Sequence, residues 1–406
     1  MWYVGCEERR EVEVIDSEVL GWTSLAKCSF SGTKLVYSFG DTIKIKDVGI
    51  NKPSTMISYG SAVEEKYYLD DIAFTKDDEM ILAIFNTGFL HPNVGESSSA
   101  IVKFWSAVNG EPVHSLYVDY EIDCMKLAPD NKLFAVGSKR HSRVTKFEDG
   151  FAYWIDDQAE ECPIYVWDMI DEWKCMKLSG HTSDVNSIVF FEDCSKMVSC
   201  SNDGKIIIWN TVTGELIKKL QGHSGAVTSI LLTPDGTHVI SCSVDETIRV
   251  WNVDSGKCEH VLHAHKASIY SLVMSNDKSL FASMSDDGTI KMWSIGDFQL
   301  LYTINVLSPD DMAYSYDDKY FYVSNSMGNI NVYDVNTGGC ISSYRDMGTY
   351  LSSNPNFGML LSSGSRGIIE LQMEPLQDLI EYAQNLYRYR ELTNEERVKY
   401  YLQPRN

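Results

Sequence analysis

Residues 180–210, GHTSDVNSIVFFEDCSKMVSCSNDGKIIIWN, decide the fold of this chain because their pattern returns at 222–252 and at 264–294. In each copy a His is followed by an Asp 22 residues later and by a Trp six residues after the Asp. All three positions move by 42 residues from one copy to the next. A fixed period of about 40–45 residues marks an array of structural repeats. The sequence therefore predicts a repeat architecture.

Each copy consists of short runs rich in Val, Ile and Phe, such as VNSIVFF at 185–191 and KIIIWN at 205–210. Turn-forming pairs such as Asp203-Gly204 separate these runs, which is typical of β-strands. Each unit is expected to form a small antiparallel sheet that cannot bury both of its faces alone. Radial stacking of such sheets around an axis buries those faces and leaves only short edges, which predicts a propeller.

The repeats resemble those of the WD40 family, over residues from about 20 to 372. In that family a His, a Ser or Thr, an Asp and a Trp form a hydrogen-bonded relay in each well-formed blade. Three full sets match: His181, Ser199, Asp203 and Trp209; His223, Ser241, Asp245 and Trp251; His265, Ser283, Asp287 and Trp293. A His/Asp/Ser set could be catalytic. The resemblance instead implies a structural role, because buried polar groups are tolerated only when they are paired.

The resemblance implies an all-β WD40 propeller, which we assign to residues 1–373. Counting strand–turn–strand units predicts eight blades, with seven as the alternative because seven is the commonest number in the family. The alternating stretch at 9–15 is expected to complete the last blade and close the ring. The first, seventh and eighth units are degenerate; Lys46 and Tyr333, for example, stand where the Trp is expected.

Residues 374–406 differ in character from the repeats. Apolar residues recur at helical spacing from Leu376 to Leu386, and Thr393 with Glu396 forms a capping box. These features predict a short C-terminal helical hairpin that braces the ring with its apolar stripe. The ending also resembles that of WD40 proteins of bacterial signalling and conflict systems, in which the propeller is often fused to effector domains.

The composition restricts the kinds of partner. The 406 residues include 57 Asp and Glu but only 35 Lys and Arg, which gives a formal net charge of −22. This charge disfavours nucleic acid and anionic membranes and favours a protein or peptide with a basic segment. With no apolar run of signal-peptide or membrane-spanning length, we expect a cytoplasmic protein. The ten cysteines lack metal-ligand spacing and no nucleotide-binding motif occurs, so neither a metal nor a cofactor is expected.

Two insertions interrupt the second and third units at the same joint, at about Asn86 to Ser99 and at Lys139 to Cys162. In WD40 propellers this joint opens on one face of the ring, the top face, and long loops there are usually functional or disordered. The second insertion is basic, then aromatic, then acidic, and we expect Arg140, Phe151 and Trp154 to contact a partner. The alternative is that the aromatic residues pack locally against the third blade.

The resemblance also implies which other residues point toward the top-face opening. They are Asp70, Asp123, Asp184, Asn186, Asn202, Thr228, Tyr270, Asp286 and, as a further candidate, Asp310. This set is acidic and contains no Lys or Arg, which favours a basic peptide, tail or cation. The alternative is an ordinary solvated acidic face.

These features predict a non-catalytic scaffold for protein–protein interaction. A sensor or regulatory subunit of a signalling or defence effector is the alternative. An enzyme is a distant third, because no phosphate-binding loop, nucleophile elbow or metal cluster is present in the sequence.

Overall fold

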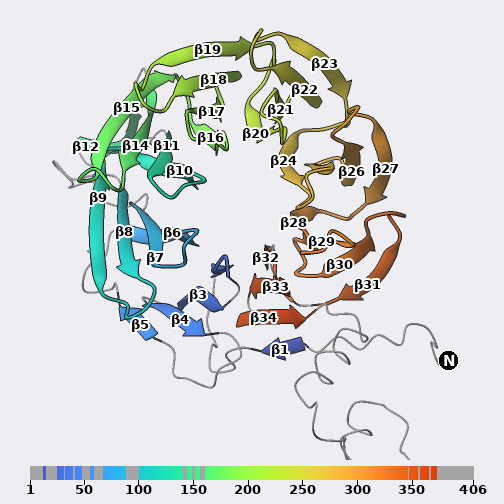
Figure 1. Cartoon of the computed structure of the whole chain (residues 1–406), viewed down its shortest axis with the longest axis horizontal. Helices are drawn as coiled ribbons and strands as arrows, with labels where there is room; N and C mark the ends of the chain where they lie inside the picture. The colour runs from blue at the N-terminus through green and yellow to red at the C-terminus, as the bar shows by residue number, and fades with distance from the viewer. Residues whose placement is uncertain are drawn as a thin grey trace, which may run out of the picture.

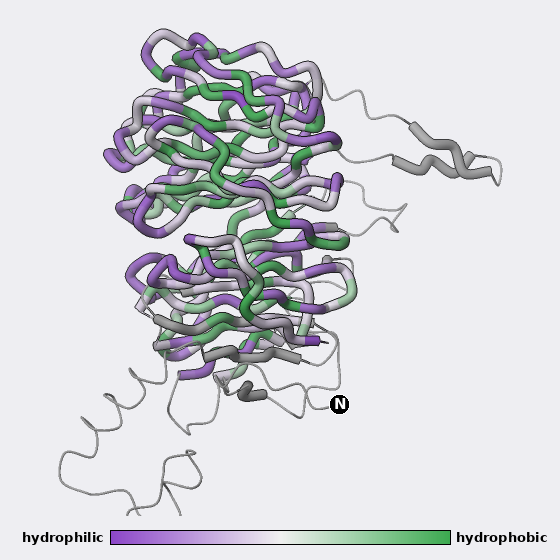
Figure 2. Tube along the Cα trace, turned by 90° about the vertical axis from the view of Figure 1, so that its right-hand side faces the viewer, coloured by the Kyte–Doolittle hydropathy of each residue, from purple (hydrophilic) through white to green (hydrophobic). Residues whose placement is uncertain are grey.

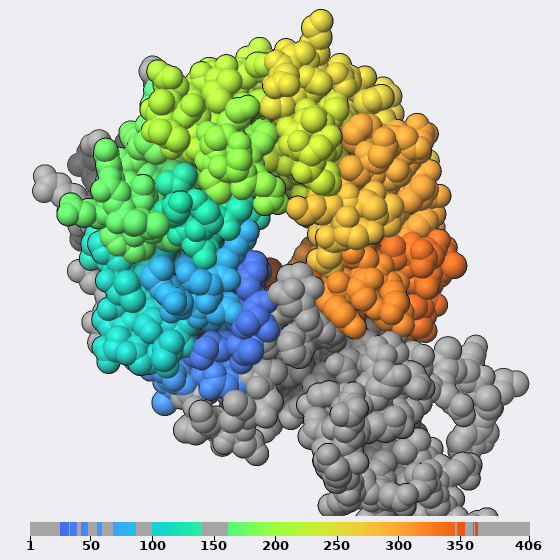
Figure 3. All heavy atoms as spheres, viewed as in Figure 1, coloured from blue at the N-terminus to red at the C-terminus, as the bar shows by residue number. Residues whose placement is uncertain are grey.

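The computed structural model describes residues 12–14, 25–31, 33–39, 42–47, 55–58, 67–87, 100–139, 144–148, 151–155, 161–345, 347–354, 357–364 and 367–372. These residues form eight four-stranded antiparallel sheets and one two-stranded hairpin, with no helix among them. The sheets are arranged as a ring around a central opening (Figures 1 and 3). The fold is an all-β propeller, as the repeats predict.

We number the sheets along the chain. Sheet 1 contains β2 (Ala26–Cys28), β3 (Lys34–Phe39), β4 (Thr42–Asp47) and β5 (Thr55–Ser58). Sheet 2 contains β6 (Tyr67–Phe74), β7 (Met80–Thr87), β8 (Ala100–Ser106) and β9 (Pro112–Val118). Sheet 3 contains β10 (Glu121–Leu127), β11 (Leu133–Lys139), β14 (Cys162–Asp168) and β15 (Lys174–His181), and its insertion holds the hairpin of β12 (Val144–Glu148) and β13 (Phe151–Ile155).

The next three sheets are the ideal repeats. Sheet 4 contains β16 (Val185–Phe190), β17 (Lys196–Ser201), β18 (Lys205–Asn210) and β19 (Leu216–Gln221). Sheet 5 contains β20 (Val227–Leu232), β21 (His238–Ser243), β22 (Thr247–Asn252) and β23 (Cys258–His263). Sheet 6 contains β24 (Ile269–Met274), β25 (Leu280–Ser285), β26 (Thr289–Ser294) and β27 (Leu300–Asn305).

In seven sheets the four strands come from one stretch of the chain, whereas the eighth sheet combines the first strand of the chain with the last three. Sheet 7 contains β28 (Pro309–Tyr314), β29 (Tyr320–Asn325), β30 (Ile330–Asp334) and β31 (Cys340–Tyr344). Sheet 8 contains β32 (Tyr350–Asn354), β33 (Phe357–Gly364), β34 (Gly367–Gln372) and β1 (Val12–Val14), which pairs with β34. Because β32 contacts both β28 and β2, sheet 8 joins the two ends of the ring.

The antiparallel order fixes which turns share a face of the ring. In each sheet the first strand is innermost and the fourth is outermost (Figure 1). The start of the first strand, the connection between the second and third strands and the end of the fourth strand therefore lie together on the top face. The other two turns lie on the opposite face, the bottom face. Both predicted insertions are connections between second and third strands and leave from the top face.

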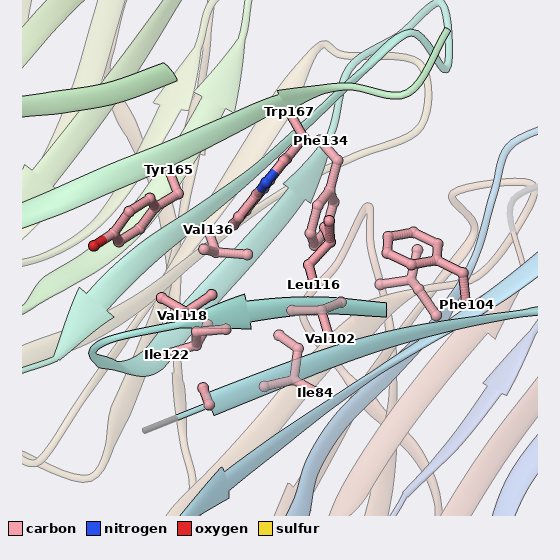
Figure 4. Packing of buried hydrophobic residues seen from close by; sticks show 12 residues of the cluster. Ile84, Val102, Phe104, Leu116, Val118, Ile122, Phe134, Val136, Tyr165 and Trp167 are labelled. Atoms are coloured by element: carbon pink, nitrogen blue, oxygen red, sulfur yellow. The ribbon is translucent and has the colours of Figure 1, made fainter. Parts of the chain in front are cut away.

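Apolar side chains fill the spaces between neighbouring sheets. In the cluster between sheets 2 and 3, Phe104 contacts Phe134 edge-on, with 5.6 Å between ring centroids, and Phe134 stacks on Trp167 (Figure 4). Hydrophilic residues gather at the turns along the edges of the ring (Figure 2). Burial of these apolar faces is the main favourable contribution to the stability of the ring.

The insertions differ from the predicted loops in two ways. The strand β7 continues through Thr87, so that Asn86 pairs with Ala100 instead of opening the insertion. The second insertion is not only a loop, because β12 and β13 form a hairpin with Val144 opposite Ile155. The predicted C-terminal helical hairpin at 374–406 lies outside the described residues.

Candidate binding face

The relay side chains of sheet 4 form one continuous chain of hydrogen bonds. The indole Nε1–H of Trp209 donates to Ser199 Oγ over 2.8 Å, and Ser199 Oγ lies 2.8 Å from His181 Nε2. The other ring nitrogen, His181 Nδ1, lies 3.1 Å from Asp203 Oδ2. A neutral imidazole protonated at Nδ1 satisfies all of these groups, with the serine hydroxyl donating to Nε2.

Sheets 5 and 6 repeat this geometry. His223 Nε2 lies 2.8 Å from Ser241 Oγ, and His265 Nε2 lies 2.8 Å from Ser283 Oγ. Burial acts to raise the pKa of each relay aspartate, but the surrounding hydrogen bonds outweigh it. Hydrogen bonds from the histidine and from backbone or threonine donors lower the pKa of all three aspartates, Asp203, Asp245 and Asp287, to about 2.

The relay serines are closed to solvent. Ser199, Ser241 and Ser283 are each 0% exposed, and each oxygen already accepts a tryptophan N–H. A nucleophilic serine must reach a substrate carbonyl, which this burial prevents. The arrangement therefore ties the strands of each sheet together. At the register position of the relay serine, sheets 2, 3 and 7 have the fully buried apolar residues Ala83, Val136 and Val323.

The predicted top-face residues of the first strands coincide with β-bulges. The register of the first strand shifts around Asp70, Asp123, Asn186, Thr228 and Tyr270. Each of these residues lies near the top-face end of its strand and is paired with no residue of the second strand. A bulge turns a side chain away from the regular alternation of a strand. These side chains can therefore point along the rim of the ring.

Three of the bulge residues connect one sheet to the next. Asn186 Nδ2 donates to the carbonyl of Val227 over 2.7 Å, and Thr228 Oγ1 donates to the carbonyl of Ile269 over 2.6 Å. Tyr270 donates its hydroxyl to the carbonyl of Pro309 over 2.6 Å, and burial raises its pKa. Each is thus an inter-sheet contact, and sequence reasoning did not foresee this role.

The acidic rim of sheets 2 to 4 also contains a lysine, which lies outside the predicted set of residues. Lys139, the last residue of β11, forms an ion pair of 3.1 Å with Asp123. Burial acts to lower the pKa of Lys139, but Asp123, with further contributions from Asp184 and Asp70, raises it. Asp70 has a raised pKa because of burial and the nearby Asp123, although Lys139 opposes this shift. These four residues form the acidic rim cluster.

A buried asparagine supports this cluster. Asn86, 2% exposed, accepts a hydrogen bond from the amide of Ile122 and donates to the carbonyl of Ile122 and to Asp70 Oδ2. It therefore joins sheet 2 to sheet 3 and holds the Asp70 carboxylate. The sequence predicts that Asn86 begins an insertion, and it gives no signal of this role.

The other half of the top face has a different character. Asn202 and Asp286 are exposed, and Asn202 Nδ2 donates to Asp184 Oδ2. Apolar side chains also protrude from the top-face turns of sheets 5 to 7. Val244, Leu307 and Met327 are 41%, 68% and 58% exposed, and Val244 occupies the position of Asp286 one sheet earlier. The top face thus combines an acidic arc with an apolar arc.

The remaining predicted contacts belong to the second insertion. Arg140 lies outside the described residues. Phe151 and Trp154 lie on β13, opposite Glu148 and Thr145 of β12. In the sequence, the pair Asp149-Gly150 stands between these two strands, and Asp-Gly favours a two-residue turn between strands. That pair was the sequence signal that could have predicted the hairpin.

Metal-ligand clusters and membrane-spanning helices are both absent from the described residues. No group of three or more His, Cys, Asp or Glu side chains in this part of the chain could hold a metal ion. Within the same residues we find no helix with the length and apolar character that crossing a membrane requires.

Comparison with known proteins agrees with this geometry. The family model "WD domain, G-beta repeat" (WD40) matches residues 173–210, 214–252 and 256–294. No curated protein matches the chain. A solved structure, that of the computationally designed Ika8 protein, is similar with a TM-score of 0.66 and 19% identity, over 87% of this chain and 97% of that chain. At this identity the likeness shows the fold alone. The repeat matches and the ring of sheets together identify the chain as a β-propeller that carries WD40 repeats.

Proposed function

We propose that the chain is a non-catalytic scaffold whose top face binds a protein or peptide through a basic segment. The observation that carries this proposal is the acidic rim cluster, in which Asp70, Asp123 and Asp184 act on a single lysine, Lys139. Three carboxylates against one ammonium group leave a net negative potential at the rim. Such a potential attracts a basic partner and orients it.

The raised pKa of Asp70 supports the same proposal. Burial and the like charge of Asp123 make the ionised form of Asp70 costly, and Lys139 offsets only part of this cost. An arginine or lysine from a partner would lower that cost further. The cluster is therefore expected to gain more from an incoming cation than a fully solvated acidic surface would.

The two insertions leave the ring beside this cluster. One follows β7, in which Asn86 holds Asp70, and the other follows Lys139 at the end of β11. We propose that the second insertion adds contacts through Arg140, Phe151 and Trp154. The apolar arc of Val244, Leu307 and Met327 would receive apolar residues of the same partner.

We also propose that sheet 8 acts as a full blade, which makes the ring eight-bladed. The formal charge of −22 supports a partner that is neither nucleic acid nor an anionic membrane, and we place the protein in the cytoplasm. The resemblance of the tail to bacterial signalling proteins supports the alternative of a sensor subunit. A sensor would change its affinity for an effector when the top face is occupied.

The test is capture of partners from the native cell extract. The triple variant Asp70→Asn, Asp123→Asn and Asp184→Asn is compared with wild type and with the control Glu111→Gln, Asp171→Asn and Glu215→Gln. The control acids are exposed, lie on bottom-face turns and give the same change in charge. We expect one stoichiometric partner to be captured by wild type and by the control but lost by the triple variant. Equal capture by all three proteins would refute the proposed face.

A second variant tests the insertion. Deletion of Arg140 to Glu160 is expected to weaken capture of the same partner. Retention of the partner at full strength would remove the insertion from the proposed interface and leave only the rim.

A further inference from the structure

A pocket of about 640 Å³ lies at the bottom end of the central channel, between the inner strands of sheets 3 to 6. The second halves of β16, β20 and β24 and the turns after β16 and β20 form its walls, and Lys126 of β10 contributes to its lining. Its volume lies in the range of small-molecule sites in proteins, about 300–1,000 Å³. It is on the face opposite the acidic rim cluster.

Lys126 brings an uncompensated positive charge to this pocket. Its side chain is exposed to the water of the channel although protein surrounds it, and in the described part of the chain it has no hydrogen bond or ion pair. Burial lowers its pKa, and the like charges of Lys76 and Lys27 lower it further. The other two lysines have nearby carboxylates: Lys76 acts on Glu192, and Lys27 on Asp71 and Asp311.

Three of the four carboxylates that line the pocket, those of Glu192, Asp193 and Asp235, already have partners. Glu192 forms an ion pair of 2.9 Å with Lys278, which connects sheet 4 to sheet 6 across the end of sheet 5. Asp235 accepts hydrogen bonds from the hydroxyl and the amide of its own turn, and Asp193 does the same in the preceding sheet. Glu192 is thus paired with Lys278, and the two aspartates are bonded within their own turns. In a chain with a net charge of −22, a lysine without a counter-ion inside a pocket is therefore available to bind an anion.

The rest of the lining indicates what such an anion would carry. Val189, Leu231 and Leu272 present hydrocarbon, whereas Ser187 and Ser229 bring hydroxyl groups. Two further lysines line the pocket: Lys278 is paired with Glu192, and Lys196 lies over the Phe191 ring. An apolar wall with a few polar and charged groups is the usual composition of a site for a small organic ligand. We propose that this pocket binds a small carboxylate with a hydrocarbon body, with Lys126 Nζ contacting the carboxylate.

The test uses hexanoate, with hexanol and inorganic phosphate as probes that lack either the charge or the hydrocarbon. Binding to the full chain is measured by calorimetry. We expect hexanoate to bind more tightly than hexanol or phosphate by at least about tenfold, because only hexanoate engages both parts of the site. Equal binding of hexanoate and hexanol would overturn the role of the charge. Equal binding of hexanoate and phosphate would overturn the role of the apolar wall.

Variants of the lysine locate the site. Lys126→Met should weaken hexanoate binding by about tenfold or more, because it removes the charged contact. Lys126→Arg should keep it within a few-fold, and the control Lys266→Met, on the top face, should leave it unchanged. Circular dichroism checks that each variant is folded. Hexanoate binding that is unaffected by Lys126→Met, or lost equally in Lys126→Arg and Lys126→Met, would contradict the proposal.

Discussion

Replacing Ser241 by Ala tests the structural role of the relay. The side chain is 0% exposed, and its oxygen lies 2.9 Å from Trp251 Nε1 and 2.8 Å from His223 Nε2. The substitution leaves two polar groups, the indole N–H and an imidazole nitrogen, inside the protein without a partner. Each costs about 1–3 kcal/mol, so we expect a loss of about 2–6 kcal/mol in the free energy of unfolding of sheet 5.

Hydrogen exchange followed by mass spectrometry measures this loss locally, which suits a ring of repeats that does not have to unfold as one unit. Amides of β21 and β22 should exchange faster in the variant by about thirtyfold or more, because thirtyfold corresponds to a loss of about 2 kcal/mol, the lower end of the expected range. The matched control is Ser224→Ala, an exposed serine of the same repeat. Exchange in Ser241→Ala that matches the control would refute the relay as a source of stability.

Two further predictions follow from the buried polar groups. The pKa of Asp245 in the folded protein is about 2, below its usual 3.8, so the unfolded chain binds more protons. The resulting stabilisation of the folded state, about 2 kcal/mol, is present above about pH 5 and disappears as the pH falls toward 2. The urea midpoint of Asp245→Asn should therefore fall less steeply with decreasing pH than that of wild type. An equal pH dependence of the two midpoints would contradict this. Asn86→Ala leaves the amide and carbonyl of Ile122 without this partner, which should lower the free energy of unfolding by about 2–4 kcal/mol. A urea midpoint equal to that of wild type would contradict this and would show that water replaces the side chain.

The fold could be predicted because its strongest signals are periodic. From the sequence alone, the 42-residue spacing assigns His223, Ser241, Asp245 and Trp251 to one sheet. Such a signal survives because a buried hydrogen-bonded set requires every member at a fixed position. The positions of these relay residues in the structure follow directly from that spacing.

The rim could be predicted only in part, because its chemistry depends on register. Thr228 reads as an exposed polar residue at the start of a strand, but a bulge turns it toward the carbonyl of Ile269 in the next sheet. Lys139 reads as the first basic residue of an insertion, but it is the last residue of β11 and pairs with Asp123. A contact between neighbouring sheets leaves no periodic trace in the sequence.

The bottom-face pocket gave no sequence signal at all. Lys126 stands between the apolar residues Met125 and Leu127, which is the ordinary pattern of a strand whose lysine faces solvent. Only the closed ring shows that this side chain faces a pocket lined by three other sheets. The hairpin of β12 and β13 is the opposite case, because the Asp149-Gly150 pair between its strands is a signal that the sequence does contain.

The most direct test of the account is the affinity of the captured partner for two single variants of the acidic rim cluster. Lys139→Met removes the cation that competes with the partner, and Asp123→Asn removes the carboxylate that pairs with that cation. If a basic segment binds this rim, Lys139→Met should bind more tightly than wild type and Asp123→Asn more weakly, and both differences should shrink as salt is added. Affinities that are unchanged, or changed in the same direction, would contradict the account.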